Sequence, residues 1–366
     1  MKANLRQAVG SLLVVGLERT ELTGLERAWL KLVRPGGVIL FRRNIQDARQ
    51  TRALLDESTA LCAPNGFRCV DVEGGRVDRL RDALAPMPSA QAVAQAAQRT
   101  GKAGLAREHG ELVARGVRAF GFNTTLAPVL DLALPESAKV LGTRTAGPTA
   151  EEVVEYGREF LAGLTAQGVA GCGKHFPGLG AGTLDSHHET PVIKRTIRKL
   201  WCEDMVPYRE LSSELPMVMV SHASYPGMPS KSLPASVSSY WIGTVLRKRI
   251  GYSGIIISDD LEMGGILKLV PIEEAAVAAI RAGMDLLEIC QSPELILRAY
   301  EALIVEGERS AAFARLLMAR AAQTARQRAN IFAGRVPAAL TAAQFEALRM
   351  RVLRFGQAIL KAQEQA

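Results

Sequence analysis

Residues 255–260 read Ile-Ile-Ile-Ser-Asp-Asp, a run of β-branched apolar residues that ends in two carboxylates. A short apolar run without polar alternation is typical of a parallel strand that is covered on both faces. Side chains alternate across a strand, so Asp259 and Asp260 point to opposite faces. Only one of them can point into the interior that the strand helps to enclose, and the residues alone leave open which one it is.

Seven further β-rich runs occur along the chain, and helical patterns lie between several of them. The predicted strands lie at residues 11–17, 37–41, 68–72, 119–122, 169–174, 217–221, 255–259 and 286–289. The predicted helices lie at residues 90–115, 151–167, 196–213, 239–249 and 272–282. Thr149 is the expected N-cap of the second of these helices, with Glu152 completing a capping box.

Eight strands that alternate with helices over about 300 residues predict an α/β fold, a (β/α)8 or TIM barrel. An open doubly wound sheet is the alternative. It lacks its usual dinucleotide fingerprint, because no GxGxxG motif follows the first strand, Val14-Val15-Gly16-Leu17.

The chain continues beyond the eighth strand without a further strand signal. We expect residues 1–295 to form the barrel domain and residues 296–366 to form a C-terminal helical extension packed on it. Five apolar residues make one stripe on the last predicted helix: Phe345, Leu348, Val352, Phe355 and Ile359. Docking on the barrel is the expected use of this stripe, and a dimer interface or a membrane-surface helix are the alternatives.

Composition and charge indicate a globular protein of the cytoplasm. The formal net charge is +8, much of it from arginines near the C-terminus, but aromatics are only 5% and are not interleaved with them. Nucleic-acid binding is therefore not expected. No stretch is long enough for a membrane span and no signal peptide is recognisable. The five cysteines are scattered and form no CxxC motif, which favours a reducing compartment.

Polar residues gather where the predicted strands end, the edge at which barrels carry their chemistry. These segments are 71–79, 174–188, 221–222 and 258–260. A zinc site is one interpretation, with candidate ligands His175, Asp185, His187, His188 and His222. No HxxxH or HExxH pair lies on a predicted helix, and the segment around Gly178, Gly180 and Gly182 is glycine-rich. We therefore expect no metal and no cofactor.

The same residues fit glycoside chemistry better. Asp185 can orient the imidazole of His187, whose other nitrogen can then exchange a proton near neutral pH. A carboxylate at the end of the 255–260 strand suits a nucleophile, although both aspartates there could equally be helix N-caps. Five residues can supply hydrogen bonds to a ligand rich in hydroxyl groups: Asp71, Arg79, Arg144, Lys174 and His175. A Schiff base on Lys174 is the rival chemistry.

Three blocks make the sequence resemble the family 3 glycoside hydrolases, in particular single-barrel bacterial β-N-acetylglucosaminidases. The segment 71–77, DVEGGRV, is similar to the family's DQEGGRV block. KHFPG at 174–178 followed by DSH at 185–187 is similar to its KHFPGHG…DSH block. Residues 245–261 resemble its active-site signature, and the resemblance covers about residues 10–290.

This resemblance implies roles for individual residues. It implies that Asp259 is the nucleophile, that His187 is the acid/base and that Asp185 is the partner of His187. It places the sugar-binding positions on Asp71, Arg79, Arg144, Lys174 and His175. The implied reaction retains the anomeric configuration and passes through a glycosyl-aspartate.

Three positions depart from the family pattern, namely Val72, Leu179 and Glu262. The expected activity is exo-acting hydrolysis of terminal β-linked N-acetylglucosamine, on muropeptides derived from peptidoglycan during cell-wall recycling. A family 3 β-glucosidase, a glycoside phosphorylase and a barrel that binds sugar without turning it over are the alternatives. The sequence makes no prediction of oligomeric state.

Overall fold

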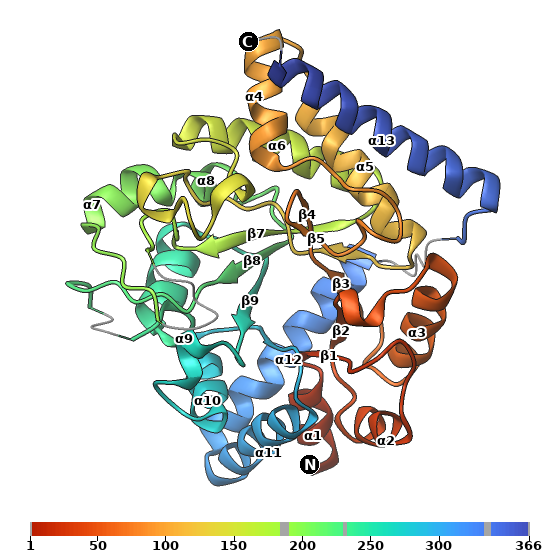
Figure 1. The fold of residues 1–366 in the computed structure, drawn as a ribbon. Helices are drawn as coiled ribbons and strands as arrows, with labels where there is room; N and C mark the ends of the chain where they lie inside the picture. Colours follow the sequence, from red (N-terminus) through yellow and green to blue (C-terminus); the bar gives the residue numbers. More distant parts are fainter. Residues whose placement is uncertain (1, 184–189, 230–232, 333–337, 365–366) are drawn as a thin grey trace.

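The computed structural model describes residues 2–183, 190–229, 233–332 and 338–364 (Figure 1). Within these ranges, eight parallel strands close into a barrel in the order β1-β10-β9-β8-β7-β6-β3-β2. They are β1 Leu13–Gly16, β2 Gly37–Leu40, β3 Phe67–Val70, β6 Thr124–Thr125, β7 Ala170–Phe176, β8 Met217–Val220, β9 Ile255–Asp260 and β10 Leu286–Ile289. The predicted (β/α)8 barrel is confirmed.

Helices surround the barrel, and a short hairpin extends from one strand. The helices are α1 Lys2–Gly10, α2 Gly24–Val33, α3 Ala48–Ala60, α4 Ala90–Thr100, α5 Leu105–Ala119, α6 Ala150–Ala166, α7 Ile197–Lys199, α8 Val206–Glu210, α9 Gly264–Leu267, α10 Ile272–Ala282, α11 Pro293–Arg309, α12 Ala311–Phe332 and α13 Ala342–Glu364. Segments of π-helix lie at Leu200–Asp204 and Tyr240–Arg249. The hairpin consists of β4 Val72–Gly74 and β5 Val77–Asp78 and directly follows β3.

Alternating apolar residues of most barrel strands fill two separate clusters. On β9, Ile255 and Ile257 belong to the cluster inside the barrel, whereas Ile256 belongs to the cluster between strands and helices. On β10, Leu286 faces inward in the same way and Leu287 faces the helices. The continuous apolar run therefore provides buried side chains on both faces of the parallel strand, as the sequence indicated.

The C-terminal end of α12 closes the amino end of the barrel. Phe332 packs edge-on against Phe67, the first residue of β3, with ring centroids 5.1 Å apart. The buried guanidinium of Arg328 donates from Nη1 to the carbonyl oxygen of Ser11, just before β1, at 3.0 Å. With this end sealed by side chains, the carboxyl ends of the strands are the open end.

The last helix, α13, lies beside α4 and α5 at the edge of the molecule (Figure 1). Leu348, Val352, Phe355 and Ile359 of the predicted stripe are buried there. The Phe355 ring stacks on His109 of α5 with centroids 6.0 Å apart. The apolar stripe is thus covered by helices of this chain. The boundary at residue 295 stays a prediction.

Two secondary-structure predictions were wrong. Residues 119–122 are not a strand, because the amides of Phe120, Gly121 and Phe122 still bond to carbonyls of the last turns of α5. The strand begins later and consists of Thr124 and Thr125. The helix predicted at 90–115 is two helices, separated where Gly101 and Gly104 adopt left-handed backbone angles.

The predicted capping box at α6 is confirmed. The Thr149 hydroxyl accepts from the amide of Glu152, and the Glu152 carboxylate accepts from the amide of Thr149. None of the helices in the described ranges combines the length and the hydropathy needed to cross a bilayer.

Candidate active site

A cavity of about 380 Å³ opens at the carboxyl end of the barrel. Its walls come from strand ends and the loops that follow them. The lining residues are Asp71, Glu73, Arg76, Val77, Arg79, Leu126, Lys139, Val140, Leu141, Arg144, Lys174, His175, Leu179, Met219, Asp259, Met263 and Glu288. Ligand sites of barrel enzymes lie at this end, so this cavity is the candidate active site.

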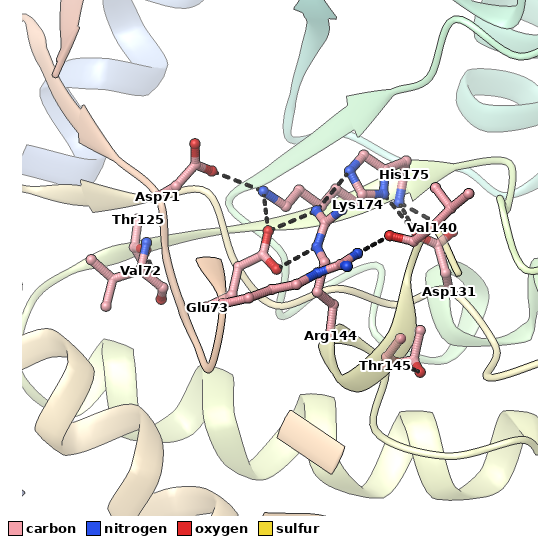
Figure 2. Close-up of polar contacts among 12 residues, drawn as sticks. Asp71, Val72, Glu73, Thr125, Asp131, Val140, Arg144, Thr145, Lys174 and His175 are labelled. Carbon is pink, nitrogen blue, oxygen red and sulfur yellow. Dashed lines mark hydrogen bonds and ion pairs between the residues drawn. The ribbon is translucent and has the colours of Figure 1, made fainter. Parts of the chain in front are cut away.

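A buried cation bridges two carboxylates on one wall (Figure 2). Lys174 Nζ, near the end of β7, lies 2.9 Å from Asp71 Oδ1 and 2.6 Å from Glu73 Oε1. Burial alone would lower the pKa of Lys174, but the two carboxylates outweigh it and raise that pKa above its usual range. The amine therefore stays protonated, which argues against a Schiff base on this lysine.

Arg144 holds the other side of Glu73 with two hydrogen bonds (Figure 2). Its Nε and Nη2 donate to Glu73 Oε2 and Oε1 at 2.8 and 2.9 Å. Burial alone would raise the pKa of Glu73, but Arg144 and Lys174 lower it below its ordinary value. The glutamate is thus an ionised anchor that fixes both cations in the cavity wall.

His175 is oriented from behind by a buried aspartate. His175 Nδ1 lies 2.7 Å from Asp131 Oδ2, and Asp131 Oδ1 also accepts from the amide of Leu179 at 2.7 Å. The other ring nitrogen, Nε2, lies 3.4 Å from Arg144 Nη2. Asp131 therefore ties the imidazole and the loop after β7 into one rigid unit.

The two adjacent aspartates of β9 have different surroundings. Asp259 lines the cavity and Asp260 does not. Burial would raise the pKa of Asp259, but His175, His222, the amide of Asp260 and Lys174 together lower it. Burial and the neighbouring acids Glu262 and Asp259 raise the pKa of Asp260 to about 7, against its bonds to backbone amides. The strand thus presents one ionised carboxylate to the cavity.

Asp260 has a structural role instead. Its Oδ1 accepts from the amides of Glu262 at 3.0 Å and Cys290 at 3.2 Å, which ties β9 to the end of β10.

The structure brings together all the predicted site residues that it describes. Asp71, Arg79, Arg144, Lys174, His175 and Asp259 line the same cavity. Asp185 and His187 lie outside the described residues. Arg79 lies on the rim, with Nη2 3.6 Å from Asp71 Oδ2.

The sequence prediction missed three acidic residues of the site, namely Glu73, Asp131 and Glu288. Glu73 lies inside the DVEGGRV block, and the glycines after it mark a tight turn. Glu288 is the one carboxylate of the otherwise apolar strand β10, and this isolated charge is a signal that could have indicated the site. Asp131 follows no predicted strand, so nothing in the local pattern indicates it.

The structure shows what surrounds the three residues that depart from the family pattern. Leu179 lines the cavity, whereas Val72 is buried in the cluster outside the barrel interior. The carboxylate of Glu262 accepts from the amide of Ser292 at 2.8 Å, at the beginning of α11. Of the three, only Leu179 can therefore contact a ligand in the cavity.

Among the described residues, no group of three or more His, Cys, Asp or Glu has the arrangement of a metal site. His222, one of the candidate ligands, contacts Ser236 Oγ through Nδ1 at 2.7 Å and the carbonyl of Asp260 through Nε2 at 2.9 Å.

The open end of this (β/α)8 barrel carries a buried network of carboxylates and cations. This arrangement is typical of barrel enzymes whose substrates offer many hydrogen-bonding groups. The comparison with family models gives its family. Residues 4–323 match the glycosyl hydrolase family 3 N terminal domain. The chain belongs to glycosyl hydrolase family 3 and is a glycoside hydrolase.

Several relatives cover most of the chain. A Beta-hexosaminidase of Alkalilimnicola ehrlichii is 41% identical over 287 residues, 78% of this chain and 82% of the relative. The structure of a glycoside hydrolase family 3 beta-N-acetylglucosaminidase from Paenibacillus sp. superposes with a TM-score of 0.84 at 32% identity, over 96% of this chain and 68% of that one. NagZ from Neisseria gonorrhoeae in complex with N-trifluoroacetyl-D-glucosamine has a TM-score of 0.76 at 29% identity, over 94% and 98%.

Proposed function

We propose that this glycoside hydrolase is a retaining exo-β-N-acetylglucosaminidase that releases terminal β-linked N-acetylglucosamine. The observation that carries the proposal is Asp259, an ionised carboxylate at the end of a rigid strand, facing a cavity lined by fixed hydrogen-bonding groups. The names of the relatives, Beta-hexosaminidase and beta-N-acetylglucosaminidase, support the choice of sugar.

In the proposed reaction Asp259 attacks the anomeric carbon while His187 donates a proton to the departing glycosidic oxygen. The bond from the anomeric carbon to that oxygen breaks and an ester to Asp259 forms. His187, now neutral, takes a proton from water, which attacks the same carbon and releases Asp259. Two inversions give net retention, and Asp185 stabilises the charged imidazole of His187.

The remaining wall residues bind the sugar in this proposal. Asp71, Arg79, Arg144, Lys174 and His175 lie on one side of the cavity, and the contacts of Glu73 and Asp131 hold three of them in place. Because these side chains are already fixed by ion pairs, little conformational entropy is lost when a sugar binds.

The natural substrate in the proposal is a muropeptide derived from peptidoglycan, and the reaction occurs in the cytoplasm during cell-wall recycling. The cysteines support this location: all five are free, and four of them are buried. A secreted protein of oxidising compartments would more often pair them.

The test compares chromogenic β-N-acetylglucosaminide and β-glucoside side by side, each with and without inorganic phosphate. We expect kcat/KM to be at least about tenfold higher for the N-acetyl sugar, with free N-acetylglucosamine as the product. Equal or faster hydrolysis of the glucoside would refute the N-acetyl specificity. A sugar phosphate as the main product would identify a phosphorylase instead.

A further inference from the structure

A fourth carboxyl group faces the cavity from the last strand of the barrel. On β10, Leu286 belongs to the apolar cluster inside the barrel, while Leu287 and Ile289 face the helices. Glu288 therefore shares the inward face with Leu286. It lines the cavity beside Asp259. Its neighbours in register are Val14 on β1 and Asp260 on β9.

The two oxygens of the Glu288 carboxyl group have different surroundings. Glu288 is only 3% exposed. Its Oε1 lies 3.2 Å from Cys290 Sγ. Its Oε2 is buried, and no residue in the described part of the chain offers it a hydrogen-bond partner. A buried polar atom without a partner costs stability, so its position in a ligand cavity indicates that it acts on a ligand.

Burial, and then the charges around Glu288, favour the neutral form of its carboxyl group. Burial raises its pKa well above the ordinary value, and the neighbouring acids Asp71, Asp260 and Asp259 raise it further. The cations of the wall do not reverse this effect, because Lys174 and Arg144 are paired with Asp71 and Glu73. A neutral carboxyl group carries an O–H, so Glu288 can donate a hydrogen bond where the surrounding carboxylates can only accept.

We propose that Glu288 is a specificity-determining residue that contacts the sugar directly, donating a hydrogen bond to one hydroxyl group of the glycone. The cavity then selects a sugar that carries this hydroxyl, because an analogue without it leaves the buried carboxyl unpaired. This inference deepens the proposed function, since it rests on a glycone bound in this cavity. It adds a contact from β10, a strand that does not carry the Lys174 network.

Two variants separate hydrogen bonding from packing. Glu288→Gln keeps a donor of the same size, so we expect its kcat/KM to stay within about threefold of the wild type. Glu288→Leu removes the donor, and we expect a loss of about 10- to 100-fold, the range for one hydrogen bond to a buried group. Glu288→Leu also removes an unpartnered polar atom from the interior, so its Tm should rise by about 2–4 °C.

The decisive comparison uses monodeoxy substrates that lack the hydroxyl on C3, C4 or C6. The series is built on whichever chromogenic glycoside the wild type hydrolyses faster. A preference for the glucoside would refute the proposed N-acetyl specificity, and the role of Glu288 is tested in either case. On the analogue that lacks the hydroxyl contacted by Glu288, the wild type and Glu288→Leu should have equal kcat/KM. On the other two analogues, Glu288→Leu should be slower than the wild type by the same factor as on the parent substrate.

Glu26→Leu is the matched control, because Glu26 is 1% exposed and does not line the cavity. Its carboxylate accepts from the backbone amides of Glu18 at 2.9 Å and Thr23 at 2.8 Å. The variant should lower the Tm and leave kcat/KM unchanged. The proposal is overturned if Glu288→Leu costs less than threefold on the parent substrate, or if its loss is the same on all three deoxy analogues.

Discussion

Asp259 and Asp260 are adjacent residues of the same type, and the pleat of β9 gives them different tasks. Asp259 faces the cavity with a lowered pKa, whereas Asp260 accepts hydrogen bonds from two amides and has a pKa raised to about 7. The sequence could place one aspartate inside and one outside. The family resemblance favoured Asp259, and in the closed barrel it is Asp259, not Asp260, that lines the cavity.

The different surroundings of Asp259 and Asp260 allow a matched pair of variants to test which aspartate is the nucleophile. Asp259→Asn should lower kcat by about 10³-fold or more, because an amide cannot form the glycosyl ester. Asp260→Asn keeps an oxygen that can accept from the amides of Glu262 and Cys290, so it should lose less than tenfold. Steady-state kinetics together with circular dichroism melts measure both effects. The reverse order of the two losses would mean that Asp260 is the nucleophile.

The lowered pKa of Glu73 predicts how the stability of the folded chain depends on pH. Because its pKa is lower in the folded chain than in the unfolded chain, its contribution is fully present above about pH 4 and is lost as the pH falls further. Glu73→Gln should cost about 3 kcal/mol at pH 7, since it leaves Arg144 and Lys174 with less compensating charge.

Urea unfolding of both proteins at pH 7 and at lower pH values measures this difference. The gap between wild type and Glu73→Gln should narrow on the acid side. A gap that is constant with pH would show that the carboxylate is not the source of the stability.

Among the site residues, the sequence predicted those that belong to recognisable blocks, such as Lys174 with His175, and those at the ends of apolar strands, such as Asp259. It did not predict Asp131, which reaches His175 across 44 positions in the chain. No local pattern encodes such a pairing, because it depends on how the segment after β6 lies against β7.

At the scale of secondary structure, the longer barrel strands and the capped helices were predictable, and the two-residue barrel strand β6 was not. Thr149 and Glu152 define the beginning of α6 through local hydrogen bonds, so the capping box could be identified from spacing alone. Phe120 and Phe122 are buried like strand residues, but their amides complete the end of α5. Burial of a few apolar residues does not distinguish a helix end from a strand.

The packing of α13 gives a prediction at the same scale. Phe355 is buried against His109, so Phe355→Ala should lower the free energy of unfolding by about 3–5 kcal/mol. Met350, on the same helix, is 43% exposed, and Met350→Ala is the control, with a change within about 0.5 kcal/mol. Neither change should alter kcat/KM at 25 °C. Equal effects on stability would show that the apolar stripe of α13 does not pack as described.

At the scale of the molecule, the two ends of the barrel differ in chemistry. Phe332 and Arg328 of α12 close the amino end with a ring and a buried guanidinium. The carboxyl end is left open and collects Asp259, Glu288 and the Lys174 network around one cavity. The alternation of strands and helices predicts this polarity, because it forces parallel strands whose carboxyl ends meet.

The central claim is that the cavity supports a glycosyl-Asp259 intermediate. In the most direct measurement, the 366-residue chain reacts with a slow fluorinated N-acetylglucosaminide that carries a good leaving group. The protein is then digested, and tandem mass spectrometry locates the adduct. We expect one sugar on the peptide that contains Asp259, and none in Asp259→Asn. A sugar on a different residue, or hydrolysis with inversion and no adduct, would contradict it.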